Sequence, residues 1–269
     1  MKILNIDDFT KVADPVKTEE TIRRQLVALA SEIITEYVYV SIPLAYFINT
    51  MGVIHVQKII NQICEEHKDK KLFFVCQHIL VNKINFNEHL VFTPHATILD
   101  SYIPIPHYSC NFDISMSKKW EERKYKFSFI GSFQTHPVRR RIYETLKDRE
   151  DCCVIDTGIW HFESDKKRQE ENARKYVEIL GDTKFSLCPR GTGPSTIRMW
   201  ESMAMGSKPV VFSDLLKYPL QFYLSSELWT SESENFSKID LSEDIAYDNA
   251  EYFKYFNNEN LFQSIIKEL

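Results

Sequence analysis

The stretch KFSLCPRGTGPSTIRMWESMAMGSKPVVFSD, residues 184–214, decides the fold. It opens within an apolar run, 183–189, that predicts a buried strand. A glycine-rich turn follows, in which Pro194 suits a first helical position and Gly193 an N-cap. Residues 194–206 then predict a helix closed by glycine, and 208–213 predict another strand. Strand, turn, helix and strand in this order are typical of a parallel sheet covered by helices.

The same alternation continues outward from this stretch. Downstream of residue 120 the pattern predicts strands at 125–132 and 152–157, and helices at 137–148 and 167–181. Upstream it predicts strands at 36–43, 71–76 and 89–94, and helices at 18–37 and 53–67. Ile22, Leu26, Leu29, Ile33 and Ile34 share one face of the first of these helices. The fold class is therefore α/β.

Two Rossmann-like domains facing across a cleft fit this length. The charged segment 115–124 is the expected link between them. We predict an N-terminal domain over residues 1–120, a C-terminal domain over 121–245 and a C-terminal helical tail over 246–269. In such parallel sheets ligands bind beyond the carboxyl ends of the strands.

Charge, cysteine content and hydropathy indicate which classes of protein the chain does not resemble. The formal net charge of the 269 residues is −5 with acids and bases interspersed, so we expect no nucleic-acid partner. The six cysteines form no CxxC pair, which favours reduced thiols. No apolar run reaches the roughly 20 residues of a membrane span, and the N-terminus lacks a signal-peptide pattern. We expect a soluble, cytoplasmic protein without a membrane span or anchor.

The turn in the opening stretch predicts a phosphate site. A helix N-terminus offers free N–H groups and partial positive charge, and the glycines let an anion approach the backbone. Arg190 can add a bidentate clamp, and Ser195 and Thr196 can donate to phosphate oxygens. Arg198 and Glu201 are three apart and so share a helix face. A guanidinium near a diphosphate and a carboxylate one turn deeper match a nucleotide, whose ribose hydroxyls the acid would bind.

Less specific interpretations remain open for these residues. Arg198 and Glu201 could be a surface pair worth a few tenths of a kcal/mol, and the glycines could simply make a turn. The stretch is not a P-loop, because no Gly-Lys-Ser/Thr follows at the required spacing. No HExxH or other helical metal spacing is present, so we expect no metal ligands.

The opening stretch resembles the C-terminal signature of the exostosin-like glycosyltransferases, glycosyltransferase family 47. That signature has a strand "F-L-P-G", a small-residue turn, "S-x-R-x-x-E-A" on a helix and then "G-x-x-P-V". Thr196 stands where serine is usual and Ser202 where alanine is usual. Upstream, FSFIGSFQTHPVRRRIYETL, DSYIPIPH, LFFVCQHI and YVYVSIP resemble further segments of the family in the same order, so the likeness covers roughly residues 36–215.

This resemblance implies a GT-B fold with the donor nucleotide in the C-terminal domain. It implies an inverting transfer from a nucleotide sugar, typically a UDP-sugar such as UDP-xylose, to a sugar hydroxyl of a glycan or glycoprotein. It also implies that no metal or other cofactor is obligatory, because a helix dipole and arginines carry the leaving diphosphate. Eukaryotic members usually have a Golgi membrane anchor. We therefore expect a xylosyltransferase-like member from a bacterium or a large, chlorovirus-type virus.

Such a reaction needs a further arginine and a base. Arg139 is the expected additional phosphate contact, because it opens a helix after Gly131, at a strand's carboxyl end; the alternative is a solvated arginine. His78, which follows the strand at 71–76, is the expected catalytic base, with Asp100 and His107 as alternatives. A lone histidine can equally be a structural hydrogen-bonder.

Two other function classes remain open. A degenerate relative would be a non-catalytic nucleotide- or glycan-binding module, although Arg198 and Glu201 are both present. A dehydrogenase needs GxGxxG in its first βαβ unit, where Gly131 stands alone.

Overall fold

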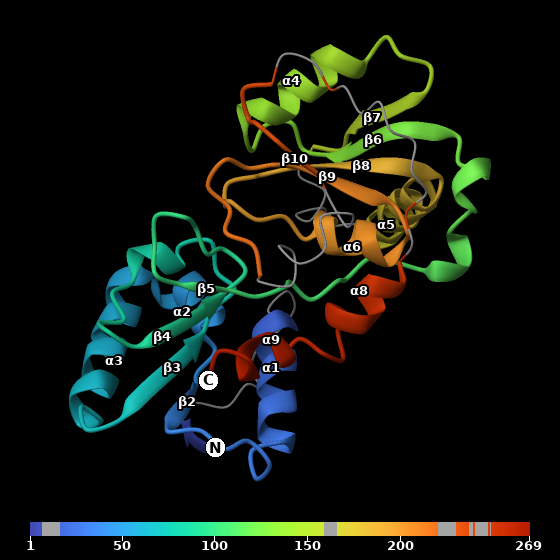
Figure 1. The fold of residues 1–269 in the computed structure, drawn as a ribbon. Helices are drawn as coiled ribbons and strands as arrows, with labels where there is room; N and C mark the ends of the chain where they lie inside the picture. The colour runs from blue at the N-terminus through green and yellow to red at the C-terminus, as the bar shows by residue number, and fades with distance from the viewer. Residues whose placement is uncertain (7–16, 159–165, 220–229, 237–238, 240–246, 248) are drawn as a thin grey trace. The chain divides into compact units, whose positions relative to one another are not determined.

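The computed structural model describes residues 1–6, 17–158, 166–219, 230–236, 239, 247 and 249–269 (Figure 1). The chain forms two compact units. Unit 1 comprises Met1–Tyr108, Leu215–Leu220 and Asn257–Leu269, and unit 2 comprises Ser109–Asp214 and Gln221–Phe256. The chain therefore passes repeatedly between the units. Each unit is described by itself below.

Unit 1 is built on a five-stranded parallel sheet whose strands follow their order in the chain. The strands are β1 (Lys2–Asn5), β2 (Tyr37–Ser41), β3 (Lys71–Val75), β4 (Leu90–Thr93) and β5 (Ile103–Pro104). In register, Phe73 lies opposite Tyr39 and Leu90. Because every strand is parallel, all five carboxyl ends lie at one edge of the sheet.

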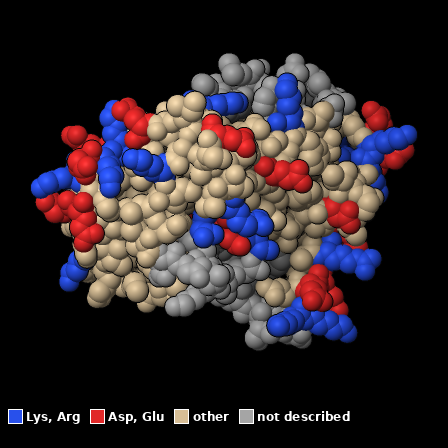
Figure 2. Space-filling model, turned by 90° about the horizontal axis from the view of Figure 1, so that it is seen from below, with Lys and Arg blue, Asp and Glu red and all other residues tan. Residues whose placement is uncertain are grey.

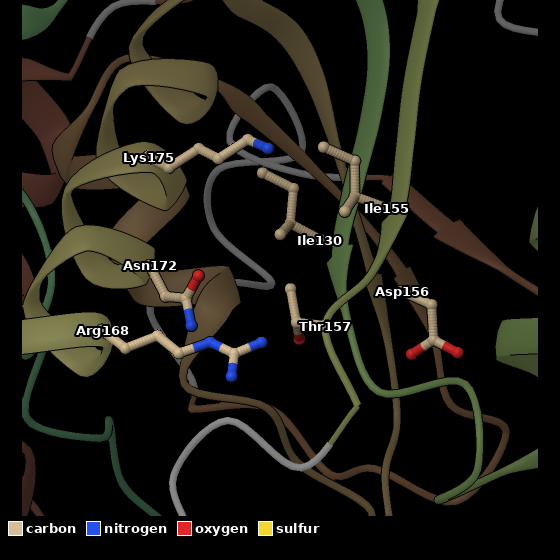
Figure 3. Close-up of a pocket in the computed structure, with 7 residues that line it drawn as sticks. All are labelled: Ile130, Ile155, Asp156, Thr157, Arg168, Asn172 and Lys175. Carbon is tan, nitrogen blue, oxygen red and sulfur yellow. The ribbon is translucent and has the colours of Figure 1, made fainter. Parts of the chain in front are cut away.

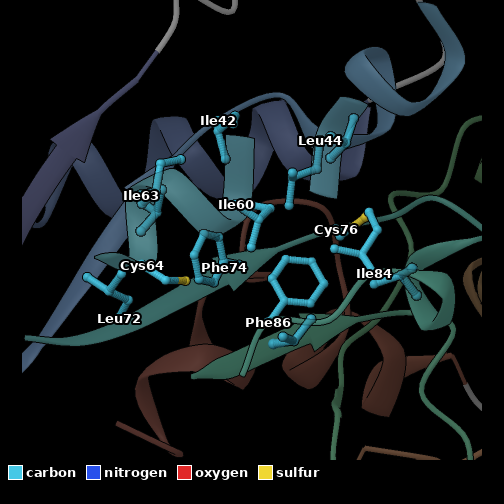
Figure 4. Packing of buried hydrophobic residues seen from close by; sticks show 14 of the residues in the cluster. Ile42, Leu44, Ile60, Ile63, Cys64, Leu72, Phe74, Cys76, Ile84 and Phe86 are labelled. Atoms are coloured by element: carbon cyan, nitrogen blue, oxygen red, sulfur yellow. The ribbon is translucent and has the colours of Figure 1, made fainter. Parts of the chain in front are cut away.

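Apolar residues on both sides of this sheet make two cores. The helices α2 (Leu44–Met51) and α3 (Val53–Glu66) cover one face, where Leu44, Ile60 and Phe74 are buried in one cluster (Figure 4). On the other face α1 (Lys17–Ala28) and α9 (Gln263–Ile266) pack in a separate cluster with Phe73 and Phe92. Burial on both faces explains why the central strands are almost continuously apolar.

Unit 2 also has five parallel strands, in the order β10-β9-β8-β6-β7. Its strands are β6 (Tyr125–Gly131), β7 (Cys152–Asp156), β8 (Thr183–Pro189), β9 (Lys208–Phe212) and β10 (Thr230–Glu232). Its helices are α4 (Pro137–Leu146), α5 (Lys166–Gly181), α6 (Arg198–Ala204) and α8 (Ala250–Tyr255). α4 lies on one face of the sheet, and α5 and α6 lie on the other (Figure 1). The predicted α/β class with parallel sheets is confirmed.

Two helices differ from their predicted bounds. The helix expected over 194–206 begins only at Arg198, and Ile197 at its start provides no side-chain cap. Pro194 is therefore not a first helical residue but lies in the loop between β8 and α6. At the start of this loop Arg139 Nε donates to the Arg190 oxygen at 2.8 Å. The helix expected to reach residue 37 ends at Ala28.

The prediction that five apolar residues share one face of that first helix is therefore wrong at the C-terminal end of the set. Ile22 and Leu26 are fully buried, but Ile34 is 100% exposed. The Met1 ammonium donates to the carbonyl oxygens of Ala30 and Ile33, which a continuing helix would have used. Short 3₁₀ turns at Val81–Lys83, Ile114–Met116 and Trp120–Glu122 complete the regular elements of the described ranges.

Three further observations concern the described ranges. No helix there combines the length and the apolar character that crossing a bilayer requires. On the face drawn in Figure 2, basic and acidic side chains are interspersed. The six cysteines all lie in these ranges, and none of them forms a disulfide bond.

Candidate functional site

The sheet order of unit 2 defines where a ligand belongs. β6 is the first strand of this unit; the chain next adds β7 on one side of it and then β8 on the other. This reversal is the topological switch point of a doubly wound sheet, and ligands bind in the crevice beyond the carboxyl ends of the two strands that flank it. For this unit the crevice lies beyond Gly131 and Pro189.

Two arginines meet at this crevice, and we call Arg139 and Arg198 the arginine pair. Arg139 lies in the first turn of α4, and its Nη1 donates to the Ser132 oxygen at 3.0 Å. Arg198 opens α6, and its Nη2 donates to the carbonyl oxygen of Ile130 at the end of β6. Strand ends leave carbonyl groups without sheet partners, so guanidinium groups can anchor there.

An aromatic ring supports both guanidinium groups. The guanidinium carbon of Arg198 lies 4.3 Å from the centroid of the Phe129 ring, and that of Arg139 lies 5.4 Å from it. Burial, together with the neighbouring Arg198 charge, lowers the pKa of Arg139 to about 10. Within the described ranges neither arginine has an ion pair with a carboxylate. Two adjacent like charges without a counter-ion form a site for an anionic ligand.

Two glycines make room for the arginine pair. A Cβ on Gly131 would lie 3.0 Å from Arg198 Nη2, and a Cβ on Gly191 would lie 3.0 Å from Arg139 Nη2. Each distance is shorter than an ordinary van der Waals contact, so a larger residue would displace a guanidinium group. Gly191, one of the turn glycines expected to let a phosphate approach, therefore lies in this structure against Arg139.

A hollow lies at the ends of β6 and β7 and against α5. It has a volume of about 250 Å³ and is lined by Ile130, Ile155, Asp156, Thr157, Arg168, Asn172 and Lys175. The Arg168, Asn172 and Lys175 side chains extend from α5 toward the strand ends (Figure 3). Ile130 connects the two features, because its carbonyl group holds Arg198 while the residue also lines the hollow.

Three other predicted donor residues lie in or next to the loop between β8 and α6. Arg190 forms an ion pair with Glu234, with 3.4 Å between Nη1 and Oε1 and 16% of each side chain exposed. Ser195 and Thr196 lie in the loop before α6 and are half-buried. Arg190 therefore points its charge toward a carboxylate in this structure, unlike the arginine pair.

Glu201 is 3% exposed and forms four hydrogen bonds. Its Oε1 accepts from the backbone N–H groups of Cys110 and Asn111 and from Asn111 Nδ2, at 3.3, 2.8 and 3.1 Å. Its Oε2 accepts from the Tyr176 hydroxyl at 2.7 Å. Burial raises the pKa of Glu201, opposed by these donors. The carboxylate predicted to contact ribose thus fixes residues 110–111 and α5 in this structure.

The three residues considered as base, His78, Asp100 and His107, lie in unit 1. The Leu80 N–H donates to His78 Nδ1 at 3.0 Å, and His78 Nε2 lies 3.0 Å from Asn49 Oδ1, so both ring nitrogens have partners. Asp100 accepts from Thr97 Oγ1 at 2.7 Å and from the Tyr102 N–H at 3.0 Å, which fixes the loop after β4. Unit 1 also contains a contact between His95 and His107.

Sequence reasoning missed Phe129, Asn111 and Tyr176, which support Arg198 and Glu201. Phe129 lies two positions after Phe127 on the same face of β6. In the sequence it is recognisable only as an apolar strand residue. Tyr176 belongs to α5, the helix before α6, and only the folded structure brings its hydroxyl group to Glu201. Trp160 and His161 follow the strand at 152–157 in the sequence and are further candidates to line the donor site. They lie outside the described residues.

Unit 2 is a doubly wound α/β domain with a basic crevice at its switch point, the class of domain that binds phosphorylated cofactors and substrates. The exostosin GT47 domain model matches residues 53–230. The chain therefore belongs to the exostosin GT47 family, a glycosyltransferase family, and the resemblance predicted from the sequence is confirmed.

Curated relatives agree with this assignment. The chain is 27% identical over 135 residues to the exostosin-1 homolog of Caenorhabditis elegans, covering 44% of this chain and 35% of the relative. It is 28% identical over 102 residues to human ribitol-5-phosphate xylosyltransferase 1, covering 37% and 22%. It is 28% identical over 104 residues to the probable glucuronoxylan glucuronosyltransferase IRX7 of Arabidopsis thaliana, covering 37% and 21%. The matches thus span about a fifth to a third of each relative.

Proposed function

We propose that this chain is an inverting glycosyltransferase of the GT-B class. It moves a sugar from a nucleotide-sugar donor to a hydroxyl group of a glycan or glycoprotein. The observation that carries the proposal is the arginine pair at the switch point of unit 2, which has no carboxylate partner within the described ranges. Two parallel α/β units in one chain are the components of a GT-B enzyme.

The arginine pair would hold the donor's diphosphate. In a single displacement the acceptor oxygen bonds to the anomeric carbon while the bond from that carbon to the diphosphate breaks. The electron pair leaves with the diphosphate, and the acceptor proton passes to a base. Negative charge therefore grows beside Arg139 and Arg198, where fixed positive groups stabilise the transition state most. The roles of Arg190, Ser195, Thr196 and Glu201 in donor binding, and of His78 or Asp100 as base, stay predictions.

The donor we favour is a UDP-sugar, with UDP-xylose first. Two of the relatives described above are named as a xylosyltransferase and a probable glucuronosyltransferase. The hollow at the end of β6 combines apolar walls at Ile130 and Ile155 with polar and charged groups, those of Asp156, Thr157, Arg168, Asn172 and Lys175. Such a lining suits a polar part of the donor that accepts hydrogen bonds from cationic side chains. In this proposal the part of the donor next to the diphosphate lies there.

Binding of UDP tests the donor site. UDP at 100 times its Kd adds about 2.7 kcal/mol to the free energy of unfolding and so raises Tm. We expect Arg139→Gln and Arg198→Gln each to weaken UDP binding about tenfold or more, because a hydrogen bond to a charged group contributes about 1.5–3 kcal/mol. Arg140→Gln is the matched control, since Arg140 is exposed on the same helix. Equal UDP affinity in all four proteins would refute the site.

Hydrolysis of the donor separates an enzyme from a binding module. Water replaces the unknown acceptor, and release of UDP from UDP-xylose and other nucleotide sugars is measured with and without EDTA. Because guanidinium groups supply the positive charge in this proposal, we expect turnover to be unchanged by the chelator. Binding of UDP without turnover of any donor would favour the non-catalytic module, and loss of turnover in EDTA would refute the metal-free mechanism.

A further inference from the structure

Three histidines follow three neighbouring strands of unit 1. His78 lies beyond β3, His95 beyond β4 and His107 beyond β5. Because these strands are parallel and adjacent, the histidines lie at the same edge of the sheet. The carboxyl edge of a parallel sheet is where such a fold presents ligand-binding side chains.

His95 and His107 form a contact, and we call them the histidine pair. Their ring centroids are 5.1 Å apart, with the rings inclined at 74°. His95 is 6% exposed and His107 is 4% exposed. His95 Nδ1 and both ring nitrogens of His107 have no hydrogen-bond partner. A buried polar atom without a partner costs about 1–3 kcal/mol, so these nitrogens indicate a site that a ligand completes.

The backbone around His95 fixes its protonation. The backbone carbonyl of Gln77 accepts a hydrogen bond from the His95 ring. Since Nδ1 is the atom without a partner, Nε2 carries the proton and Nδ1 presents a lone pair. Burial and the neighbouring His78 lower the pKa of His95 to about 4, and burial lowers the pKa of His107 well below its usual range. Both rings are therefore neutral near pH 7.

Neutral imidazole rings favour ligands that can both donate and accept a hydrogen bond. Each offers one N–H donor and one lone-pair acceptor, and a hydroxyl group likewise donates once and accepts. A phosphate or carboxylate would instead favour protonated rings or arginines. His78 has no ring nitrogen left for a ligand, because its Nδ1 and Nε2 form hydrogen bonds with Leu80 and Asn49. The unfilled valences of the histidine pair thus match an uncharged alcohol.

We propose that His95 and His107 bind a hydroxyl group of a sugar or polyol, with His95 Nδ1 accepting its hydrogen bond and the His107 ring completing its coordination. Naming this hydroxyl as part of the acceptor substrate rests on the proposed glycosyltransferase function. The binding site itself does not depend on it. In the transfer reaction the histidine pair positions the acceptor from unit 1.

Ring signals of labelled histidine test the proposal directly. The protein carrying ¹⁵N-labelled histidine is titrated with methyl β-D-xylopyranoside and methyl β-D-glucopyranoside to about 100 mM, enough to detect a millimolar Kd. We expect the His95 Nδ1 signal and the His107 signals to shift and saturate. The exposed His55, whose Nδ1 bonds only the Met51 oxygen among described partners, should stay in place. Signals of the histidine pair that do not move, as for a pair completed by water alone, would overturn the proposal.

Variants separate this site from the donor site. His95→Gln and His107→Gln should each lose saturable glycoside binding and keep the rise in Tm that UDP causes, while His55→Gln keeps both. A glycoside titration of His95→Gln that matches the wild type overturns the proposal. If a variant fails to fold, the titration of the wild-type protein decides alone. UDP binding without any glycoside response would refute only the histidine site. Glycoside binding without UDP binding would refute only the proposed donor site.

Discussion

At the scale of single residues, the surroundings of a charge decide what it can do. Arg190 and Arg198 lie eight positions apart and looked equivalent in the sequence. Arg190 pairs with Glu234, whereas Arg198 donates to a strand-end carbonyl and packs on Phe129. Only Arg198 keeps its positive charge without a carboxylate ion pair within the described ranges. The type of residue is visible in a sequence, but its counter-ion is supplied by the fold.

Glu201 gives a prediction at this scale. Glu201→Gln places an amide NH₂ group among the N–H and O–H donors of Cys110, Asn111 and Tyr176. We expect the free energy of unfolding to fall by about 1–3 kcal/mol, because a buried donor loses its acceptor. Urea unfolding measures the change, with Glu178→Gln as the control on exposed α5 surface. An unchanged stability together with weakened UDP binding would instead make Glu201 a direct ligand contact.

At the scale of elements, charges and backbone groups set where helices begin and end. In the loop before α6 the Arg190 oxygen accepts from Arg139 Nε, and beyond the end of α1 the carbonyl oxygens of Ala30 and Ile33 accept from the Met1 nitrogen. The N-terminus of α2 shows the reverse case. The Ala45 N–H donates to the Glu19 carboxyl group at 3.2 Å, and the Gln77 N–H donates to it at 2.7 Å. A helix start leaves its first N–H groups without partners in the helix, and Glu19 provides an acceptor for one of them.

Glu19 links stability to pH. It is fully buried, and burial raises its pKa from 4.5 to about 8 against the opposing backbone donors. The folded state therefore holds a proton that the unfolded state releases, so the free energy of unfolding falls as pH rises through this window. Between about pH 6.5 and 8 we expect a loss of about 2 kcal/mol. The histidine pair contributes only below that range, because its pKa values are lowered.

Urea unfolding at several pH values measures this slope. Glu19→Gln should lack it, since an amide does not titrate. Cys76 lies beside Glu19, but its pKa is raised well above 9 and so lies outside the window. Parallel pH curves for the two proteins would show that Glu19 stays ionised throughout and that its backbone donors outweigh the cost of burial.

At the scale of the whole molecule, distant segments of the chain build one core. Leu261 and Ile265 are fully buried against Ile22 and Leu26 of α1. Gln25 adds polar contacts, since its Nε2 donates to the Asn258 oxygen at 2.8 Å and its Oε1 accepts from the Phe262 N–H at 3.1 Å. Unit 1 therefore needs residues 257–269 for its second core.

Truncating one of these side chains tests that dependence. We expect Leu261→Ala to lower the free energy of unfolding by about 2–5 kcal/mol, through lost burial and the cavity left behind. Leu99→Ala is the control, because Leu99 is 77% exposed, and it should change stability by less than about 0.5 kcal/mol. Similar midpoints of urea unfolding for both variants would mean that the packing of Leu261 contributes little to the stability of unit 1.

The sequence predicted the class of fold and most of the strands, because periodicity and glycine punctuation are local, but it did not predict the short strands β1, β5 and β10. It also pointed to Arg139 and Arg198 through their positions at strand ends. It missed Tyr176 and the support from Phe129, since contacts across elements leave no local pattern. It weighed His107 only as an alternative to His78 and overlooked His95, because a histidine's unfilled valences become visible only when its neighbours are placed.

The route of the chain through the two units has a consequence during translation. α1 and the first strands of unit 1 are synthesised before unit 2, whereas the segment that packs on α1 follows unit 2 in the chain. Until residues 257–269 are made, part of the apolar side of α1 therefore has no cover, and apolar surface exposed in this way on an incomplete chain is prone to aggregation. Maturation of the first unit is thus a late event, even though its first residues are made before any of the second.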